Sequence, residues 1–371
     1  MRLKFTIVLA GLLGASSALV NCCNAASQVS TAPVTEEVSW AIGGTTVSAA
    51  ITIPAGRGLY PAVVFVPGSG PTDRDWNSIL LPGTNGSALL LADELSRGGF
   101  VVLRYDKRFT GPNAKGNLAL LAGKLSMNTH VEELAGAVAL LRAREDVDPK
   151  RIFVLSNSEG AIHALNYQLQ KEPKFAGLVL TSAPGRLLKD LMRSQVQPQV
   201  AALPNAAEVM EHYDKLVDNF LAGQPFAADP LLPESINQLM HAFYQPLSLP
   251  FARELFEIDP AALLGRVRAP ALVLIGKKDI QVDWQADGAL LMKAAGVNVS
   301  FAYPENADHV LKYEARPRSE LTAADGAKYN ATGRTLDTET LKSILDWLKL
   351  HAAPTDDGQE AAPRIASVSR P

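Results

Sequence analysis

The stretch RIFVLSNSEGAIHALNYQLQ, Arg151 to Gln170, decides the fold. It begins with an apolar run typical of a strand buried on both faces, and it ends with apolar residues at the three- and four-residue spacing of a helix. The turn between them centres on Ser158, with the small residues Ser156 and Gly160 two positions before and after it. Such a strand–turn–helix element presents a serine as a nucleophile at the carboxyl end of a strand. The alternative is an ordinary turn in which a serine caps the helix.

Similar patterns recur along the chain. Apolar runs bounded by turn residues lie at 61–68, 100–106, 175–182 and 269–276, and a shorter run lies at 299–303. Helical spacing is seen at 87–99, 129–145, 288–296 and 340–352. Two further strands are expected within Val38–Pro54, because Gly43-Gly44 supplies the positive φ angles of a tight hairpin. Continuous apolar strands alternating with helices predict an α/β fold with a mostly parallel central sheet and helices on both faces.

One region breaks this alternation. Residues 186–268 contain no strong strand pattern and instead read as helices separated by prolines. We interpret them as a helical cap inserted between core segments at 27–185 and 269–351. The last stretch, 352–371, is rich in proline, alanine and charge and is expected to be a disordered tail.

Composition limits the class of function. The 371 residues are 47% hydrophobic, enough for a large buried core, and carry a formal net charge of −3. A chain without a basic excess is not expected to bind nucleic acid. Its two cysteines, Cys22 and Cys23, can build neither a disulfide framework nor a structural zinc site.

The first 26 residues look like a secretory leader. A basic start, MRLK, precedes an apolar run and then small residues, with cleavage expected after about Ala25 or Ala26. Cleavage there would leave no cysteine, which suits an oxidising compartment, and we expect a secreted or periplasmic protein. The alternatives are a retained anchor, although the run is shorter than the roughly 20 residues that span a bilayer, or lipidation of Cys22 despite the poorly fitting Asn21. Membrane contact is expected only in those two cases.

A nucleophilic serine needs a histidine base. The six histidines are His130, His163, His212, His241, His309 and His351. His309 is the candidate, because it follows the last expected strand in the loop PENADHVLK. His130 is expected on the surface at the start of a helix, and His163 is expected to pack on the helix that follows Ser158. His212 and His241 fall within the cap, and His351 lies at the end of the last helix.

The acid that orients the base should also follow a strand. Asp279 stands three residues after the glycine that ends the apolar run at 269–276. Asp283 lies deeper in the next segment. Asp308 adjoins His309, and the side chains of neighbouring residues usually diverge. Ser158, Asp279 and His309 then follow the chain order of one known class of serine hydrolase.

An oxyanion hole needs two backbone N–H groups. One is expected from Glu159, directly after the nucleophile, and the second from the loop PGSGPTDRDWN that follows the apolar run at 61–66. Ser69 is the favoured donor in that loop, and Gly68 is the alternative.

Five motifs in one order carry a resemblance: GSGPTDRD from Gly68, RYDKRFTG from Arg104, NSEG from Asn157, GKKDIQV from Gly276, and ADH ending at His309. Over residues 38–350 the chain resembles the α/β-hydrolase superfamily, in its bacterial esterase and acyl-hydrolase branch related to serine aminopeptidases. The resemblance implies an α/β-hydrolase fold and a small-molecule carboxylic ester as substrate, without a cofactor or metal. Pro67 and Ser156 depart from the histidine and glycine usual at those places, which affects fine geometry rather than the reaction class.

Two questions stay open at this level. The charged segments Asp73–Asp75 and Arg104–Arg108 are interpreted as a salt-bridged brace under the oxyanion loop, with substrate contact as the alternative. The cap residues Met192, Phe220, Met240, Phe243 and Tyr244 belong either to the cap core or to an acyl pocket.

Ester hydrolysis is the favoured function, and there are two competitors. A peptidase acting on short peptides would need cap carboxylates to hold a free amine, for which the candidates are Glu208, Glu211, Asp214 and Asp218. Their helical spacing is more typical of the solvent-exposed face of a helix. A binding protein on a hydrolase fold is the third hypothesis, and the complete set of Ser, His and Asp candidates disfavours it.

Overall fold

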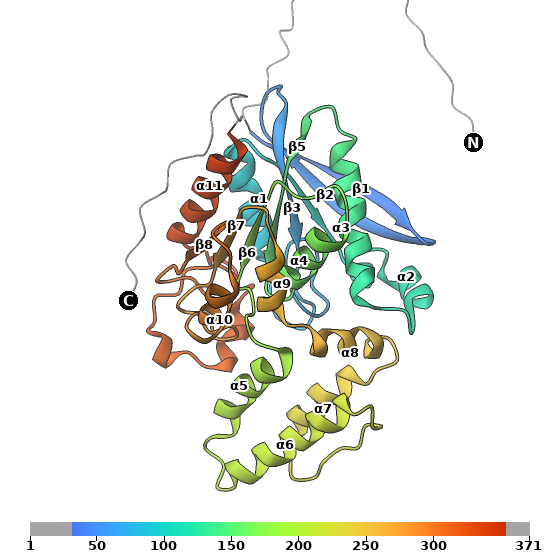
Figure 1. The fold of residues 1–371 in the computed structure, drawn as a ribbon, viewed down its shortest axis with the longest axis vertical. Coiled ribbons are helices and arrows are strands. Elements are labelled where there is room, and N and C mark those ends of the chain that lie inside the picture. The colour runs from blue at the N-terminus through green and yellow to red at the C-terminus, as the bar shows by residue number, and fades with distance from the viewer. Residues whose placement is uncertain (1–31, 354–371) are drawn as a thin grey trace, which may run out of the picture.

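The computed structural model describes residues 32–353, which form an eight-stranded sheet flanked by helices (Figure 1). The strand order is β1-β2-β4-β3-β5-β6-β7-β8. The strands are β1 (Val34–Ile42), β2 (Thr45–Ile53), β3 (Tyr60–Val66), β4 (Val101–Tyr105), β5 (Val147–Asn157), β6 (Gly177–Thr181), β7 (Ala271–Leu274) and β8 (Val299–Ala302). The pairings β1–β2 and β2–β4 are antiparallel, and all other pairings are parallel. The predicted mostly parallel α/β sheet is therefore confirmed.

Both faces of the sheet are covered, because alternate residues of each strand point to opposite sides. In β3, Val63 and Phe65 pack with α1 (Ser87–Arg97) and α11 (Thr338–Ala352). Val64 and Val66 pack in a second hydrophobic cluster, separate from the one that contains Val63 and Phe65. That cluster contains residues of α3 (Met127–Arg142), α4 (Gly160–Gln170), α9 (Pro260–Arg266) and α10 (Ala286–Ala294). The continuous apolar strands follow from this double burial.

Four helices form a separate layer at one end of the molecule, at the bottom of Figure 1. They are α5 (Leu188–Val200), α6 (Ala206–Leu221), α7 (Glu234–Phe243) and α8 (Leu249–Glu257), and they share a hydrophobic core of their own around Val209, Phe220 and Met240. The helix α9, grouped with the cap on sequence, packs instead on the core helices α4 and α10.

Smaller elements complete the chain. A short helix, α2 (Ala114–Leu121), follows β4, and two 3-10 turns, Arg318–Glu320 and Ala323–Lys328, lie between β8 and α11. The expected leader at 1–26, with its cysteines, lies outside the described residues, and so does the expected tail at 352–371 beyond its first two residues. Within residues 32–353, no helix has the length and apolar character needed to cross a bilayer.

Candidate active site

The turn between β5 and α4 holds Ser158 in a strained conformation. Its φ angle is +55°, a value that costs energy in residues other than glycine. The turn is tight, because a Cβ atom at Gly160 would lie 2.6 Å from the carbonyl oxygen of Val66 and 2.7 Å from that of Pro67. Ser156, where glycine is usual, is fully buried, and its hydroxyl donates to the carbonyl of Val179 at 3.4 Å. The sequence requirement for small residues on both sides of Ser158 thus has a steric basis.

The structure brings His309 and Asp279 together. Nδ1 of His309 lies 2.9 Å and 3.0 Å from the two carboxylate oxygens of Asp279, and both side chains are almost fully buried. The carboxylate is also held by the backbone N–H groups of Gln281 and Val282, at 2.8 Å and 2.9 Å. Asp279 can therefore fix the imidazole with Nε2 as its free nitrogen.

The two competing acids have other partners. Asp283 accepts hydrogen bonds from the backbone of Gln285 and Ala286 at the start of α10. Asp308 pairs with Arg334 at 2.6 Å. Neither carboxylate bonds to the ring of His309, so the geometry singles out Asp279.

Burial and charge act in opposite directions on His309. Burial lowers the pKa of His309, but the neighbouring Asp279 carboxylate outweighs it and raises that pKa above its usual value. The histidine is therefore a stronger base than it would be in water.

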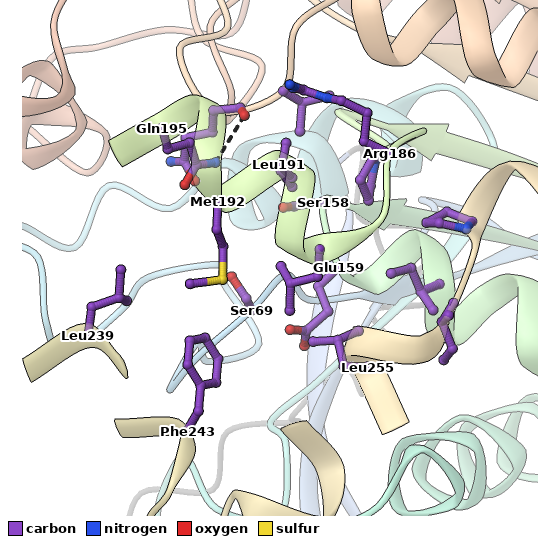
Figure 2. Close-up of a pocket in the computed structure, with 17 residues that line it drawn as sticks. Ser69, Ser158, Glu159, Arg186, Leu191, Met192, Gln195, Leu239, Phe243 and Leu255 are labelled. Carbon is purple, nitrogen blue, oxygen red and sulfur yellow. Dashed lines mark hydrogen bonds between the residues drawn. The ribbon is translucent and has the colours of Figure 1, made fainter. Parts of the chain in front are cut away.

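Ser158 lies between two cavities. The first, of about 220 Å³, lies between the core and the cap. Figure 2 shows Met192, Leu239 and Phe243 of the cap across from Ser158 and Glu159. The second, of about 260 Å³, contains both Ser158 and His309 and is walled by the loop after β3. His309 is the one histidine that lines either cavity. No hydrogen bond joins Ser158 to His309 within the described chain, a looseness common in ligand-free catalytic sites.

Two backbone N–H groups beside Ser158 have no acceptor. Among residues 32–353, the amides of Ser69 and Glu159 make no hydrogen bond, and both residues line the first cavity with Ser158. Unpaired amides next to a nucleophile are what an oxyanion hole requires.

The charged segments form a brace behind this loop. Arg74 pairs with Asp106 at 2.8 Å and Arg104 pairs with Asp75. The ammonium group of Lys107 donates to the backbone of the loop itself. None of these five side chains lines either cavity with Ser158, in agreement with the structural interpretation.

Comparison with known proteins places the chain in a family. The family model described as "Alpha/beta hydrolase family" matches residues 63–324. The chain belongs to the alpha/beta hydrolase family. The resemblance drawn from the five motifs is confirmed at that level.

One sequence relative and two solved structures are similar to the chain. The chain is 29% identical over 270 residues to Esterase EstD of Thermotoga maritima, covering 70% of this chain and 57% of that protein. It thus spans little more than half the length of that relative. GrgF, an alpha/beta hydrolase from Penicillium sp., superposes with a TM-score of 0.52 at 16% identity, over 86% of this chain and 99% of the other. An acylaminoacyl peptidase from Pyrococcus horikoshii gives 0.51 at 13% identity, over 89% and 43%. These two structures support the fold alone.

One expectation from the sequence was wrong. His130 is not at the surface but 2% exposed. Its Nδ1 lies 3.0 Å from Oε2 of Glu133, and its ring centroid lies 4.2 Å from that of His163, with the two rings tilted by 34°. Phe251 of α8 packs against both rings. The acidic residue one helical turn after His130 is a local signal of this pairing, whereas the covering cap residue is not visible in sequence.

The cap carboxylates lie away from the site. Asp214 pairs with Arg193 at 2.8 Å, and Glu208, Glu211 and Asp218 are exposed. None of the four lines either cavity with Ser158. Within residues 32–353, no group of three or more His, Cys, Asp or Glu side chains is arranged to hold a metal ion.

Proposed function

We propose that this protein is a serine hydrolase that cleaves carboxylic esters through an acyl-enzyme on Ser158. One observation carries the proposal: the buried Asp279–His309 pair and the two unpaired amides of Ser69 and Glu159 converge on Ser158. That set supplies the base, the orienting acid and the oxyanion donors of two-step acyl transfer.

The steps follow from these positions. His309 takes the proton of Ser158 through Nε2 while the serine oxygen attacks the ester carbonyl. The amides of Ser69 and Glu159 bind the negative oxygen of the tetrahedral intermediate. His309 then gives its proton to the departing alcohol, and the same histidine activates the water that releases the acid.

The two cavities divide the substrate between them. The departing oxygen must receive its proton from His309, which lines the second cavity and not the first. We therefore assign the alcohol to the second cavity and the acyl chain to the first. The first is walled mainly by apolar side chains of the cap and of α4, among them Met192, Phe243 and Leu255, which favours an apolar acyl group.

The charge pattern favours esters over peptides with a free amine. A substrate ammonium needs an accessible carboxylate, and the four cap candidates lie outside both cavities. Glu159 lies on the wall of the first cavity, but its carboxylate is already paired with Lys107 and His163. Arg186, the cation on the wall of the first cavity, is held by Asp287 through two side-chain bonds of 3.0 Å and 2.7 Å. We accordingly place ester hydrolysis ahead of peptidase activity.

Export is a second part of the proposal. It rests on the basic start, apolar run and small residues of 1–26. Expression of the full chain, followed by N-terminal sequencing of protein from the periplasm and the medium, tests it. A start near residue 26 or 27 supports cleavage, and an intact N-terminus in the cytoplasm contradicts it.

The test of the hydrolase assignment uses p-nitrophenyl esters from acetyl to palmitoyl. Wild type should turn over at least part of this series, and Ser158→Ala should not. Ser156→Gly, which restores the residue usual at that place, is the matched control and should retain turnover. Activity that survives in Ser158→Ala would contradict the assignment of the nucleophile.

A further inference from the structure

Lys107 is a buried cation for which the proposed mechanism has no use. Its side chain is 2% exposed, and the residue lies two positions after the end of β4. The ammonium group donates to the carbonyl oxygens of Gly68 and Gly70, the latter at 3.2 Å. Burying an ammonium group costs several kcal/mol unless it is well paired. Its presence here therefore calls for a role in the loop that it contacts.

The bond to Gly68 fixes the direction of one oxyanion donor. The peptide that joins Gly68 to Ser69 is planar and trans, so its C=O and its N–H point in opposite directions. Holding the Gly68 carbonyl on Lys107 therefore turns the Ser69 N–H away from Lys107. The Ser69 carbonyl is held separately by the hydroxyl of Thr72 at 2.7 Å. The peptide that carries the donor and the peptide that follows it are thus both anchored.

The same ammonium group reaches the residue that carries the second donor. It lies 3.6 Å from Oε1 of Glu159, and His163 lies 3.2 Å from the same oxygen. Burial alone would raise the pKa of Glu159, but the Lys107 charge and the His163 bond lower it to about 2. Glu159 is therefore an anion near neutral pH, paired with Lys107.

We propose that Lys107 is a positioning residue that sets the oxyanion hole, by holding the loop of Ser69 and the side chain of Glu159 on one ammonium group. It acts through these residues and touches no substrate, because it lines neither cavity with Ser158. The inference rests on the proposed function, since it assigns Ser69 and Glu159 as oxyanion donors. It goes beyond that function by giving Lys107, one residue of the charged brace, a part in the rate.

The test compares Lys107→Met with Arg104→Met. Methionine fills the space of either side chain without its charge. Arg104 is a matched control, because it is buried in the same segment and pairs with Asp75 but has no hydrogen bond to residues 68–70. Lys107→Met should lower kcat by about 10- to 100-fold, since loss of one oxyanion donor costs about 10²–10³. KM should change less than about twofold. Arg104→Met should keep kcat within about threefold of wild type.

A transition-state analogue separates positioning from a merely structural role. A trifluoromethyl ketone adds to the serine and places a negative oxygen in the oxyanion hole, so its inhibition constant should rise by the same factor as kcat falls. Amide hydrogen exchange reads the loop without any substrate. Exchange of the Thr72 amide, which donates to the Gly70 carbonyl that Lys107 holds, should be about tenfold faster in Lys107→Met than in wild type and unchanged in Arg104→Met.

Each outcome decides between the two claims. Wild-type kcat and inhibition in Lys107→Met, or equal losses in both variants, would overturn the positioning role while the ester hydrolase stands. Absence of ester turnover and of inhibitor binding in wild type would overturn the proposed function, and the positioning role with it. Loop exchange that does not respond to Lys107→Met would overturn the anchoring even if kcat falls.

Discussion

The side-chain amide of Asn157 donates a 3.0 Å hydrogen bond to the backbone carbonyl of His309. The residue directly before Ser158 thus holds the loop that carries His309. Ser182, at the end of β6, donates to the same carbonyl at 2.8 Å. Three loops from the carboxyl ends of the sheet are tied together at this one oxygen, which explains how a histidine 151 positions after Ser158 in sequence reaches it.

Replacing Asn157 by leucine should slow catalysis. The variant keeps the volume but removes the donor, so the His309 loop loses one of its two anchors. We expect kcat/KM to fall by about fivefold, because loss of one neutral hydrogen bond costs about 1 kcal/mol. Steady-state kinetics on p-nitrophenyl esters measures this. Asn166→Leu, a buried amide on α4 away from the site, is the control. Equal kinetics in Asn157→Leu and wild type would show that the anchor is dispensable.

The pH dependence of kcat/KM should report His309. Only the neutral imidazole can accept the proton of Ser158, so kcat/KM should rise with pH through the pKa of His309. Because the Asp279 carboxylate raises that pKa in spite of burial, the midpoint should lie above the usual value of about 6.5.

Asp279→Asn should move that midpoint in the opposite direction. Without the carboxylate, burial remains and lowers the pKa of His309, so the acid limb should shift to lower pH. kcat should also fall by about 10³- to 10⁴-fold, because the imidazole loses its orienting partner. If the midpoint of the acid limb of the kcat/KM profile is the same in Asp279→Asn as in wild type, the pairing of Asp279 with the catalytic base is contradicted.

The two cavities should respond separately to substitution. Phe243→Ala enlarges the cap cavity, so the preferred acyl chain in the p-nitrophenyl series should lengthen. Leu80→Ala, on the exposed wall of the second cavity, should leave acyl preference alone and change the ranking of acetate esters with different alcohols. The opposite assignment would show itself as a change of alcohol preference in Phe243→Ala.

The contact between Arg186 and Asp287 should be important for stability. Asp287 is fully buried and accepts bonds from the Arg186 guanidinium and from the backbone N–H groups of Gly185 and Asp283. Asp287→Asn leaves the guanidinium without its counter-charge and should lower the free energy of unfolding by about 3 kcal/mol. Urea denaturation measures the change.

The exposed pair Lys342–Asp346 is the control for that experiment. Both side chains are more than half exposed, so Asp346→Asn should change the free energy of unfolding by less than about 0.5 kcal/mol. Similar small effects in both variants would show that the buried pair adds little.

Much of the site could be predicted because its determinants are local. The strand, turn and helix around Ser158 are each encoded by a short pattern. The tightness of the turn explains why the residues around Ser158 are small. Asp279 and His309 also follow strands of one parallel sheet, whose carboxyl ends meet at one edge. Their pairing then follows from topology.

Other features depend on contacts between distant residues and leave no local pattern. Burial of His130 requires Phe251 from the cap, about 120 positions away in sequence. The helix α9 adjoins the cap in sequence, yet its Leu264 packs in the core. The bonds of Lys107 to Gly68 and Gly70 connect two recognised motifs, but neither motif indicates which carbonyl the ammonium group meets.

The central claim is that Ser158 carries the acyl group. It is tested most directly by mixing the protein with p-nitrophenyl butyrate, quenching with acid within the first turnover, and mapping the peptides by mass spectrometry. The account predicts a butyryl group on the peptide that contains Ser158, absent in Ser158→Ala. Hydrolysis without any acylated peptide, or an acyl group on another residue that persists in Ser158→Ala, would contradict it.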